Sequence, residues 1–296
     1  MKRKLTILYG FVVIVVLLWG SIVCGNAVKI FYSDGFIQQG ESYDRVEVYD
    51  TPPSHTTVNM TGGYIGNISE WDSGLYTYNT STVNISGGNV EFLRSYDLST
   101  VNVIGGYVGD WCGCTGLELH DLSTLNVYQG GTLFGGSFNV LELMDSSRLN
   151  VFGGDAILFV MTQHFSTVNV HDGYIYGGIE PHEYSTISVY GGRVDLWGGI
   201  LGNVIVPETS TVNIYGYGFV YEPKGEWRYY IDDPDNGMWT SRLTGWGIDG
   251  TPITYLGLPD PATHTNIHLI PEPNTIGLFA LGALLATKKR GRNNLS

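Results

Sequence analysis

Acidic side chains recur at one fixed position along the middle of this sequence, two residues before a recurring serine. Five of the seven positions are acidic, and the seven residues are Asn79, Asp97, Asp121, Asp145, His164, Glu183 and Glu208. A column of carboxylates offers the oxygen ligands that Ca²⁺ prefers. Asp and Asn also hydrogen-bond backbone amides in turns, which explains the same residues without a metal. We favour the turn, and Ca²⁺ at the five acidic positions stays open as the only cofactor that the sequence suggests.

Residues suited to catalysis are sparse by comparison. Glycoside hydrolysis needs two positioned carboxylates, but the only acidic cluster, at 232–235, has the composition of a solvated turn. His264 and His268 have the spacing of a zinc-binding helix but lack its glutamate. Cys112 and Cys114 are too few for a zinc site and fit a local disulfide or free thiols. We therefore predict a non-enzymatic protein, with a polysaccharide lyase or glycoside hydrolase as the alternative.

Aromatic residues give the best indication of a binding surface. Tyrosines follow the paired glycines of three repeats, and two tryptophans lie a little further on: Tyr64, Tyr107, Trp111, Tyr174 and Trp197. Rings that face outward would form a platform on which sugar rings stack, whereas rings packed at corners would be structural only. An apolar residue follows each tyrosine, and this alternation favours the outward orientation. We therefore predict a glycan platform.

These positions recur because one phrase, Ser-Thr-Val-Asn-Val-x-Gly-Gly, is written eight times with substitutions. Its fourth position falls 18–25 residues apart, at Asn59, Asn84, Asn102, Asn126, Asn150, Asn169, Ser188 and Asn213. Apolar and polar residues alternate within each copy, which predicts short strands. Each asparagine therefore points outward, either into a ladder of amides hydrogen-bonded between coils or simply into water, and the alternation favours water.

Three short strands and three turns per repeat predict an all-β fold, a right-handed parallel β-helix (solenoid) of about eight coils. The handedness follows from the general rule for parallel strand connections. A β-propeller would need about 40 residues per repeat, and no segment has the helical period of a βαβ crossover. Each coil buries its apolar residues only by stacking on its neighbours, so the stack needs atypical ends.

Composition divides the chain into five segments. We expect a signal peptide at 1–27, an N-terminal cap at 28–53, solenoid repeats at 54–221, a β-rich C-terminal cap at 222–270 and a sorting signal at 271–296. Between Val28 and Ile270 there are 8 basic and 27 acidic residues. Such a body repels phosphate backbones, which excludes nucleic acid as a partner.

The N-terminus has the three parts of a secretory signal peptide. Basic residues at 2–4 precede an apolar run, and small residues end it at Gly25 and Ala27. We expect signal peptidase to cut before Val28. Cys24 suggests a lipoprotein, but Val23 is bulky where a small residue is needed, so ordinary cleavage is favoured; an uncleaved anchor is the remaining alternative.

The C-terminus also has three parts: Pro271-Glu272-Pro273, an apolar run at 276–286, and a basic cluster from Lys288. As a helix, the run would be about 16 Å long at about 1.5 Å per residue, well short of a hydrocarbon core of about 30 Å. The basic cluster would hold its end on the cytoplasmic side. A short transmembrane helix with these flanks indicates a processing signal rather than a permanent anchor.

Over residues 271–296 the chain resembles the PEP-CTERM sorting-domain proteins of Gram-negative bacteria. The resemblance implies recognition near Pro271, Glu272 and Pro273 by an exosortase, a membrane-embedded transpeptidase. It also implies transient anchoring in the membrane and a final location at the cell surface or in the extracellular matrix, with exopolysaccharide as the expected partner. We therefore expect an exported structural or adhesive protein, and a plain membrane tail is the alternative for this end.

Overall fold

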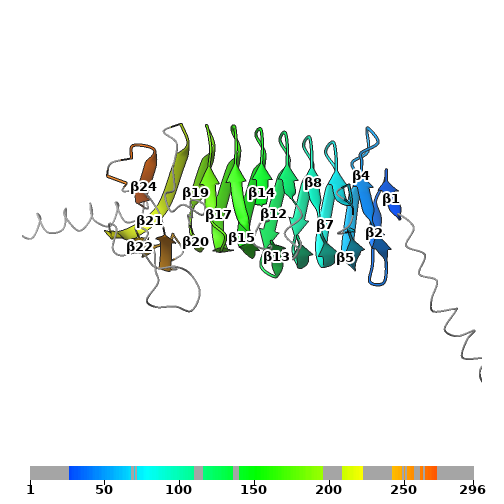
Figure 1. The fold of residues 1–296 in the computed structure, drawn as a ribbon, viewed down its shortest axis with the longest axis horizontal. Coiled ribbons are helices and arrows are strands. Elements are labelled where there is room, and N and C mark those ends of the chain that lie inside the picture. The colour runs from blue at the N-terminus through cyan, green and yellow to red at the C-terminus, as the bar shows by residue number, and fades with distance from the viewer. Residues whose placement is uncertain are drawn as a thin grey trace, which may run out of the picture.

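The structure is a computed structural model. It describes residues 27–67, 70, 72–109, 116–135, 140–195, 209–222, 242–248, 250, 252–256, 261–262 and 264–271. Within these ranges there are 24 β-strands and no helix. The strands stack as parallel coils into a β-solenoid (Figure 1), so the predicted all-β, parallel β-helical fold is confirmed. Among the described residues, the eight phrase copies form eight successive rungs, which enclose about seven turns.

One wall of the solenoid is an eight-stranded parallel sheet, called wall A here. Each coil contributes one strand to it, because the alternating sequence of that segment repeats. In stacking order the strands are β1 (Val28–Phe31), β4 (Arg45–Val48), β6 (Gly74–Thr77), β8 (Leu93–Ser95), β11 (Leu117–Leu119), β14 (Val140–Leu143), β16 (Phe159–Thr162) and β18 (Ile179–Pro181).

The repeated phrase forms a second wall, called the phrase wall, in which every copy pairs in parallel with the copies before and after it. Its strands in stacking order are β2 (Gly35–Ile37), β5 (Thr57–Ile65), β7 (Thr82–Val90), β9 (Thr100–Val103), β12 (Thr124–Tyr128), β15 (Arg148–Ile157), β17 (Thr167–Ile175), β19 (Thr186–Val189), β21 (Thr211–Glu222) and β24 (Ile267–Pro271).

The third wall begins at the glycine pair, where the chain bends. It contains the second halves of β5, β7, β15 and β17 together with β3 (Ser42–Tyr43), β10 (Gly106–Val108), β13 (Gly131–Phe134), β20 (Arg193–Asp195) and β23 (Pro252–Leu256). Gly106 has φ 79°, and a Cβ there would lie 2.6 Å from the carbonyl oxygen of Gly88 in the previous coil. Only glycine fits such a bend, which explains the paired glycines of the phrase.

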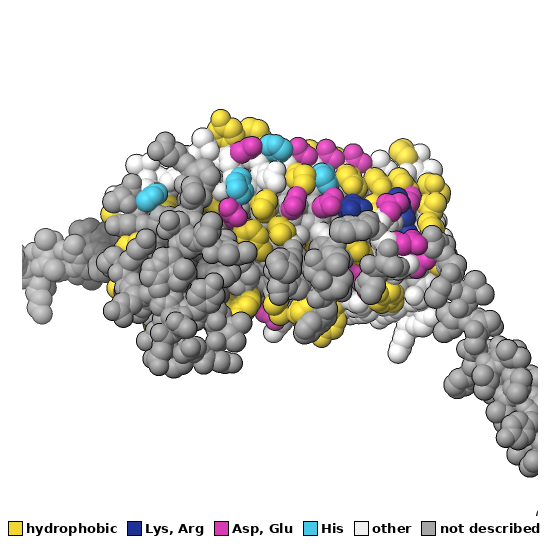
Figure 2. All heavy atoms as spheres, in the orientation of Figure 1, with side chains coloured by type: hydrophobic (Ala, Val, Ile, Leu, Met, Phe, Trp, Pro, Cys, Tyr) yellow, Lys and Arg dark blue, Asp and Glu magenta, His cyan; other side chains and the backbone are white. Residues whose placement is uncertain are grey.

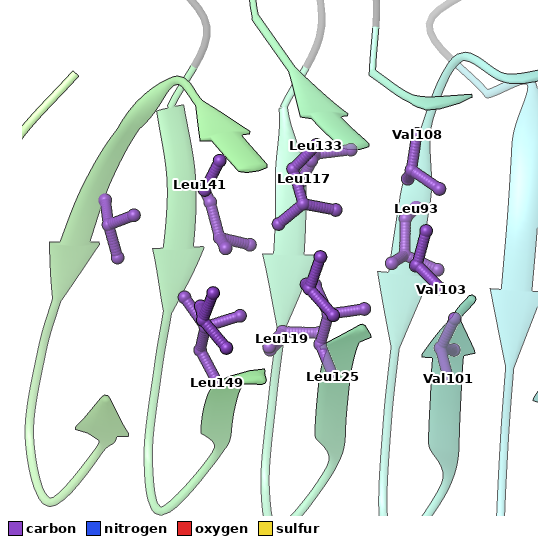
Figure 3. Packing of buried hydrophobic residues seen from close by; sticks show 14 of the residues in the cluster. Leu93, Val101, Val103, Val108, Leu117, Leu119, Leu125, Leu133, Leu141 and Leu149 are labelled. Atoms are coloured by element: carbon purple, nitrogen blue, oxygen red, sulfur yellow. The ribbon is translucent and has the colours of Figure 1, made fainter. Parts of the chain in front are cut away.

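Aliphatic side chains from the three walls fill the interior in columns that run along the axis (Figure 3). Leu93, Leu117 and Leu141 are in register on wall A, and Leu125 lies in register with Val101 on the phrase wall. All five are at most 1% exposed. Burying each such side chain contributes about 1.5–3 kcal/mol, so the inward half of the alternating pattern is what holds the coils together.

Both predicted caps contain strands that belong to the stack. Residues 28–53 form a first coil, with β1 paired to β4, and β2 and β3 paired to β5. At the other end, β22 (Arg242–Trp246) forms antiparallel pairs with β21 and β23, and β23 adds to the third wall. The regular pattern of parallel coils therefore changes near Glu222, as the sequence predicts, but β24 returns to the phrase wall.

Candidate binding surfaces

The recurring acidic position lies in the turn that leads from wall A into the phrase wall. Six of its seven residues are described, and all six have a positive φ of 53–61°: Asn79, Asp97, Asp121, Asp145, His164 and Glu183. The turn is closed by the serine two residues later, whose amide donates to the carbonyl oxygen three residues before it, as Ser99 does to Tyr96. Asn and Asp tolerate this left-handed conformation better than most residues, which favours them here.

The side chains of this edge also join successive coils. Asp97 Oδ2 accepts a hydrogen bond from the amide of Asn79 in the preceding coil at 2.8 Å, and Asp121 Oδ2 accepts one from Asp97 at 3.0 Å. Asp145, His164 and Glu183 continue the series at 3.2 Å each. The predicted turn chemistry is therefore present, except that each side chain caps an amide of the preceding coil and not its own.

The same edge was the candidate Ca²⁺ site. Figure 2 shows its acidic and histidine side chains as a row along the upper edge of the molecule. No group of three or more His, Cys, Asp or Glu within the described ranges is arranged to hold a metal ion. Glu208 lies outside the described residues. Because the other carboxylates already accept amide hydrogen bonds, their spacing has an explanation that requires no ion.

The outward asparagines of the phrase wall form a continuous amide ladder. Each Nδ2 donates to the Oδ1 of the previous coil at 2.8–2.9 Å, and the ladder runs through Asn59, Asn84, Asn102, Asn126, Asn150 and Asn169. The outward orientation was predicted correctly. The preference for simple solvation was wrong, because in-register coils bring the amides within hydrogen-bonding distance.

The predicted glycan platform lies on the third wall and is discontinuous. Tyr64 and Tyr107 are both in register with Asn89, which separates them. Tyr107 is 58% exposed, in agreement with the outward prediction. The Tyr174 ring is half-buried, 5.5 Å from the Tyr176 ring and 4.8 Å from the Arg193 guanidinium. Tyr64 donates a hydrogen bond to buried Glu91, so Tyr107 alone among these tyrosines presents most of its ring.

Trp111 and Trp197, the two tryptophans of the predicted platform, lie outside the described residues, as do Cys112 and Cys114. The three tyrosines of the predicted platform lie in one column of the third wall, but they are not adjacent in it. Asn89, Thr132 and Asp155 occupy the positions between them. Continuous rows of rings lie elsewhere on the surface, at positions that were not predicted from the sequence.

One such row, called the charged stack, lies on the outer face of wall A. Its rings are Tyr32, Tyr49, Tyr78, Tyr96 and His120, stacked in that order with centroids 4.5–5.6 Å apart. The residues that precede the turn supply it, directly before Asn79, Asp97 and Asp121. A repeat alignment extended by one residue towards the N-terminus would have revealed this row.

Charged groups line the charged stack. Tyr49 donates to Glu47 Oε2 at 2.8 Å, Arg94 Nε lies 3.1 Å from Glu118 Oε2, and His120 Nε2 lies 3.4 Å from the same oxygen. The contact with His120, together with Arg94, holds the pKa of Glu118 below its usual range. Reciprocally, the Glu118 carboxylate raises the pKa of His120. Figure 2 shows these charged groups gathered on the outer face of wall A.

Burial also affects a tyrosine between the two arginines of this face. The Tyr76 ring lies 4.1 Å from the Arg45 guanidinium and 5.5 Å from that of Arg94. Burial of its hydroxyl, with a hydrogen bond to Asp72, raises the pKa of Tyr76 to about 12. Arg45 in turn pairs with Asp72 and Glu47. The positive charges of this face are therefore matched by carboxylates within it.

A second row, called the neutral stack, lies on the phrase wall in the C-terminal half of the solenoid. It consists of Tyr128, Phe152, His171, Tyr190 and Tyr215, with centroids 4.5–5.3 Å apart. His171 lies between Phe152 and Tyr190, and partial burial there lowers its pKa. These residues come two positions after the fourth residue of the phrase, where the sequence varies most from copy to copy.

The predicted sorting signal is described only at its first residue. Pro271 is the last residue of β24 and is exposed, whereas Glu272 and Pro273 lie outside the described residues. Within the described part of the chain, no helix has the length and hydropathy of a membrane span. The apolar runs at both ends of the sequence lie outside the described residues.

Comparison with known proteins adds no relative to this description. No family model, curated protein or solved structure matches the chain.

Proposed function

We propose that this chain is an exported, non-enzymatic protein of the cell surface or extracellular matrix, associated there with exopolysaccharide. The observation that carries the proposal is the repetition of the outer surface. The same kinds of side chain return in successive coils, as in the asparagine ladder and the two aromatic stacks. A repeating surface suits adhesion, in which many weak contacts add up, whereas catalysis needs one specially arranged site.

Maturation at both ends is part of the proposal. Signal peptidase removes residues 1–27, and an exosortase recognises Pro271, Glu272 and Pro273 while the segment 276–286 holds the chain in the membrane. The three-part composition of each end supports this sequence of events. The position of Pro271 supports it too, because the motif begins at the end of β24, the last strand among the described residues.

The full chain should be expressed in a Gram-negative host that has an exosortase, and in the same host with the exosortase gene deleted. In the host with the exosortase, we expect the intact mass of the surface protein to match a chain that begins at Val28 and lacks the basic tail from Lys288. In the host without the exosortase, we do not expect this mass. Alanine in place of Pro271, Glu272 and Pro273 should leave the precursor in the membrane fraction, whereas Pro261→Ala should not.

Two results would contradict the proposal. A surface protein that still carries Lys288–Ser296 in the exosortase host would mean that the tail is a plain anchor. Release of shortened or unsaturated oligosaccharides from exopolysaccharide incubated with the purified protein would favour the alternative, a lyase or glycoside hydrolase.

A further inference from the structure

The phrase wall presents four outward columns, because every second residue from the turn onward faces out. The two middle columns are half-buried and polar, and together they are called the polar lane. The first is threonine in seven of eight coils, at Thr57, Thr82, Thr100, Thr124, Thr167, Thr186 and Thr211, with Arg148 in the eighth. The second is the column that contains the asparagine ladder.

More exposed apolar side chains lie on both sides of the polar lane. On the turn side are Leu98, Leu122, Phe165 and Tyr184, which are 55–65% exposed. On the opposite side, in the C-terminal coils, is the neutral stack, in which Tyr128 and Phe152 are 36% and 38% exposed. The lane is therefore a polar strip between two apolar rows, and it runs parallel to the axis of the solenoid.

The lane keeps unused hydrogen-bonding capacity in every coil. A carboxamide has two N–H donors and two acceptor positions on its oxygen, and an internal rung of the ladder uses one of each. Within the described part of the chain, the hydroxyls of Thr100, Thr124, Thr167 and Thr186 have no hydrogen bond. Coils that carry both a ladder asparagine and one of these threonines, as at Thr100, Thr124 and Thr167, therefore offer an amide donor, an amide acceptor and a hydroxyl in positions fixed by the strands.

Charge restricts the kind of ligand. Arg148 is the only permanently charged residue among the eight described coils of the lane, and no carboxylate lies in it. The turn edge beside the lane, however, carries Asp97, Asp121, Asp145 and Glu183, which would repel a polyanion. A ligand with hydroxyl groups, apolar faces and no charge fits this combination best.

We propose that the polar lane binds a neutral, extended polysaccharide chain lying parallel to the solenoid axis. Coils repeat at the strand spacing of about 4.8 Å, so a polymer of one repeated sugar meets an outward amide or hydroxyl group at each successive coil. The sugar hydroxyls would form hydrogen bonds with the polar lane, and the apolar faces of the sugar rings would contact the side chains of the flanking rows. The inference rests on the proposed surface role and names the ligand class and the face for it.

The test is binding of the full chain, purified in detergent, to suspensions of cellulose and curdlan as neutral polymers and to alginate beads as an anionic one. We expect retention on at least one neutral polymer and none on alginate. The double variant Thr124→Glu, Thr186→Glu places charges in the lane and should weaken retention about tenfold or more, which corresponds to about 1.4 kcal/mol. Its melting temperature should remain within a few degrees of wild type, because both threonines are half-buried on the outer surface.

Thr132→Glu is the matched control. Thr132 is an outward, half-buried threonine on the third wall, in register with Tyr107, so its replacement should leave retention unchanged. Loss of retention in Thr132→Glu but not in the lane variant would place the binding face on the third wall and overturn the proposal. Retention only on alginate, or on no polymer, would overturn it as well. The assay is independent of export and of tail cleavage, so failure here leaves the maturation experiment to judge the proposed function separately.

Discussion

The charged stack on wall A and the neutral stack on the phrase wall are built alike but have different surroundings. Each contains five rings, and each includes one histidine. His120 ends the charged stack beside Glu118 and Arg94, and its pKa is raised. His171 lies inside the neutral stack between Phe152 and Tyr190, and its pKa is lowered. The same geometry therefore favours opposite protonation states on the two walls.

The difference shows that ring stacking does not by itself determine what a wall can bind. In both stacks the ring faces contact each other, so the edges of the rings are what they present outward. A sugar ring stacks on a face, and among the described rings of the predicted platform only Tyr107 is mostly exposed. What separates the two walls is the polar groups beside the rings, which are ion pairs on wall A and amides and hydroxyls on the phrase wall.

The largest effect on stability is expected from a substitution in the asparagine ladder of the phrase wall. In Asn126→Asp, the donor to Asn102 Oδ1 at 2.8 Å is lost, and a carboxylate oxygen faces the amide oxygen instead. The bond from Asn150 to position 126 can persist. We expect a loss of about 1–3 kcal/mol in the free energy of unfolding, measured by denaturant titration, because two acceptor oxygens then face each other at half-buried positions without a donor between them.

Thr124→Asp is the control for this change. It introduces the same charge two residues earlier on the same strand, on the same face, at a side chain outside the ladder. Its cost should stay within about 0.5 kcal/mol, as for most surface substitutions. Equal losses in both variants would mean that charge alone destabilises this wall and that the ladder contributes nothing measurable.

The ladder also illustrates what the sequence could and could not predict. Alternation within each phrase correctly placed Val101 and Val103 inside and Asn102 outside, because side chains alternate along a strand. Whether Asn102 meets Asn84 depends on register between coils. The repeated phrase aligns the coils, but the repeats differ in length by several residues, so the sequence alone does not show that successive asparagines come within hydrogen-bonding distance.

The stacks were missed because they mix residue types. Tyr78, Tyr96 and His120 share the position directly before the turn residue, but they are not one residue type, so the repeated phrase does not mark them as a row. The turn acids were recognised from spacing, but the amide that each one caps belongs to the previous coil. Composition also gave no sign that the serine at the start of each phrase, such as Ser99, is fully buried, where its hydroxyl donates to the Tyr96 carbonyl oxygen.

An intermediate effect on stability is expected from a substitution beside the charged stack on wall A. Glu118→Gln removes the charge that pairs with Arg94 and His120, and we expect a loss of about 0.5–1 kcal/mol, because the pair is partly exposed. The pKa of Glu118 is lowered in the folded protein, so its contribution to stability is present at pH values above its unfolded pKa of 4.5. The pKa of His120 is raised, so its contribution is present at pH values below its unfolded pKa of 6.5. The loss should therefore be largest at about pH 5–6 and smaller at about pH 8, where only the arginine pair remains.

Glu142→Gln provides the comparison for Glu118→Gln. Glu142 occupies the next position in the same column, in register with Glu118, and has no hydrogen bond or ion pair to another described residue. Its replacement should leave stability unchanged within error at both pH values. A pH-dependent loss of the same size at Glu142 would attribute the effect to the net charge of the wall and not to the contacts of His120.

The smallest effect concerns the histidines themselves and tests the comparison most directly. NMR titration should place the pKa of His120 above 6.5 and that of His171 below it. A lowered histidine pKa means that its contribution to stability is present above pH 6.5 and lost as pH falls, the opposite of the trend for His120.

In Phe152→Ala one face of the His171 ring meets water, so the pKa of His171 should rise towards 6.5, because burial is the cause of the shift. Tyr128→Ala removes a ring that stacks on Phe152, one ring further from His171, and should leave the titration unchanged. A His171 pKa that stays low in Phe152→Ala would show that the stack does not set the protonation state, and the contrast between the two walls would then require another cause.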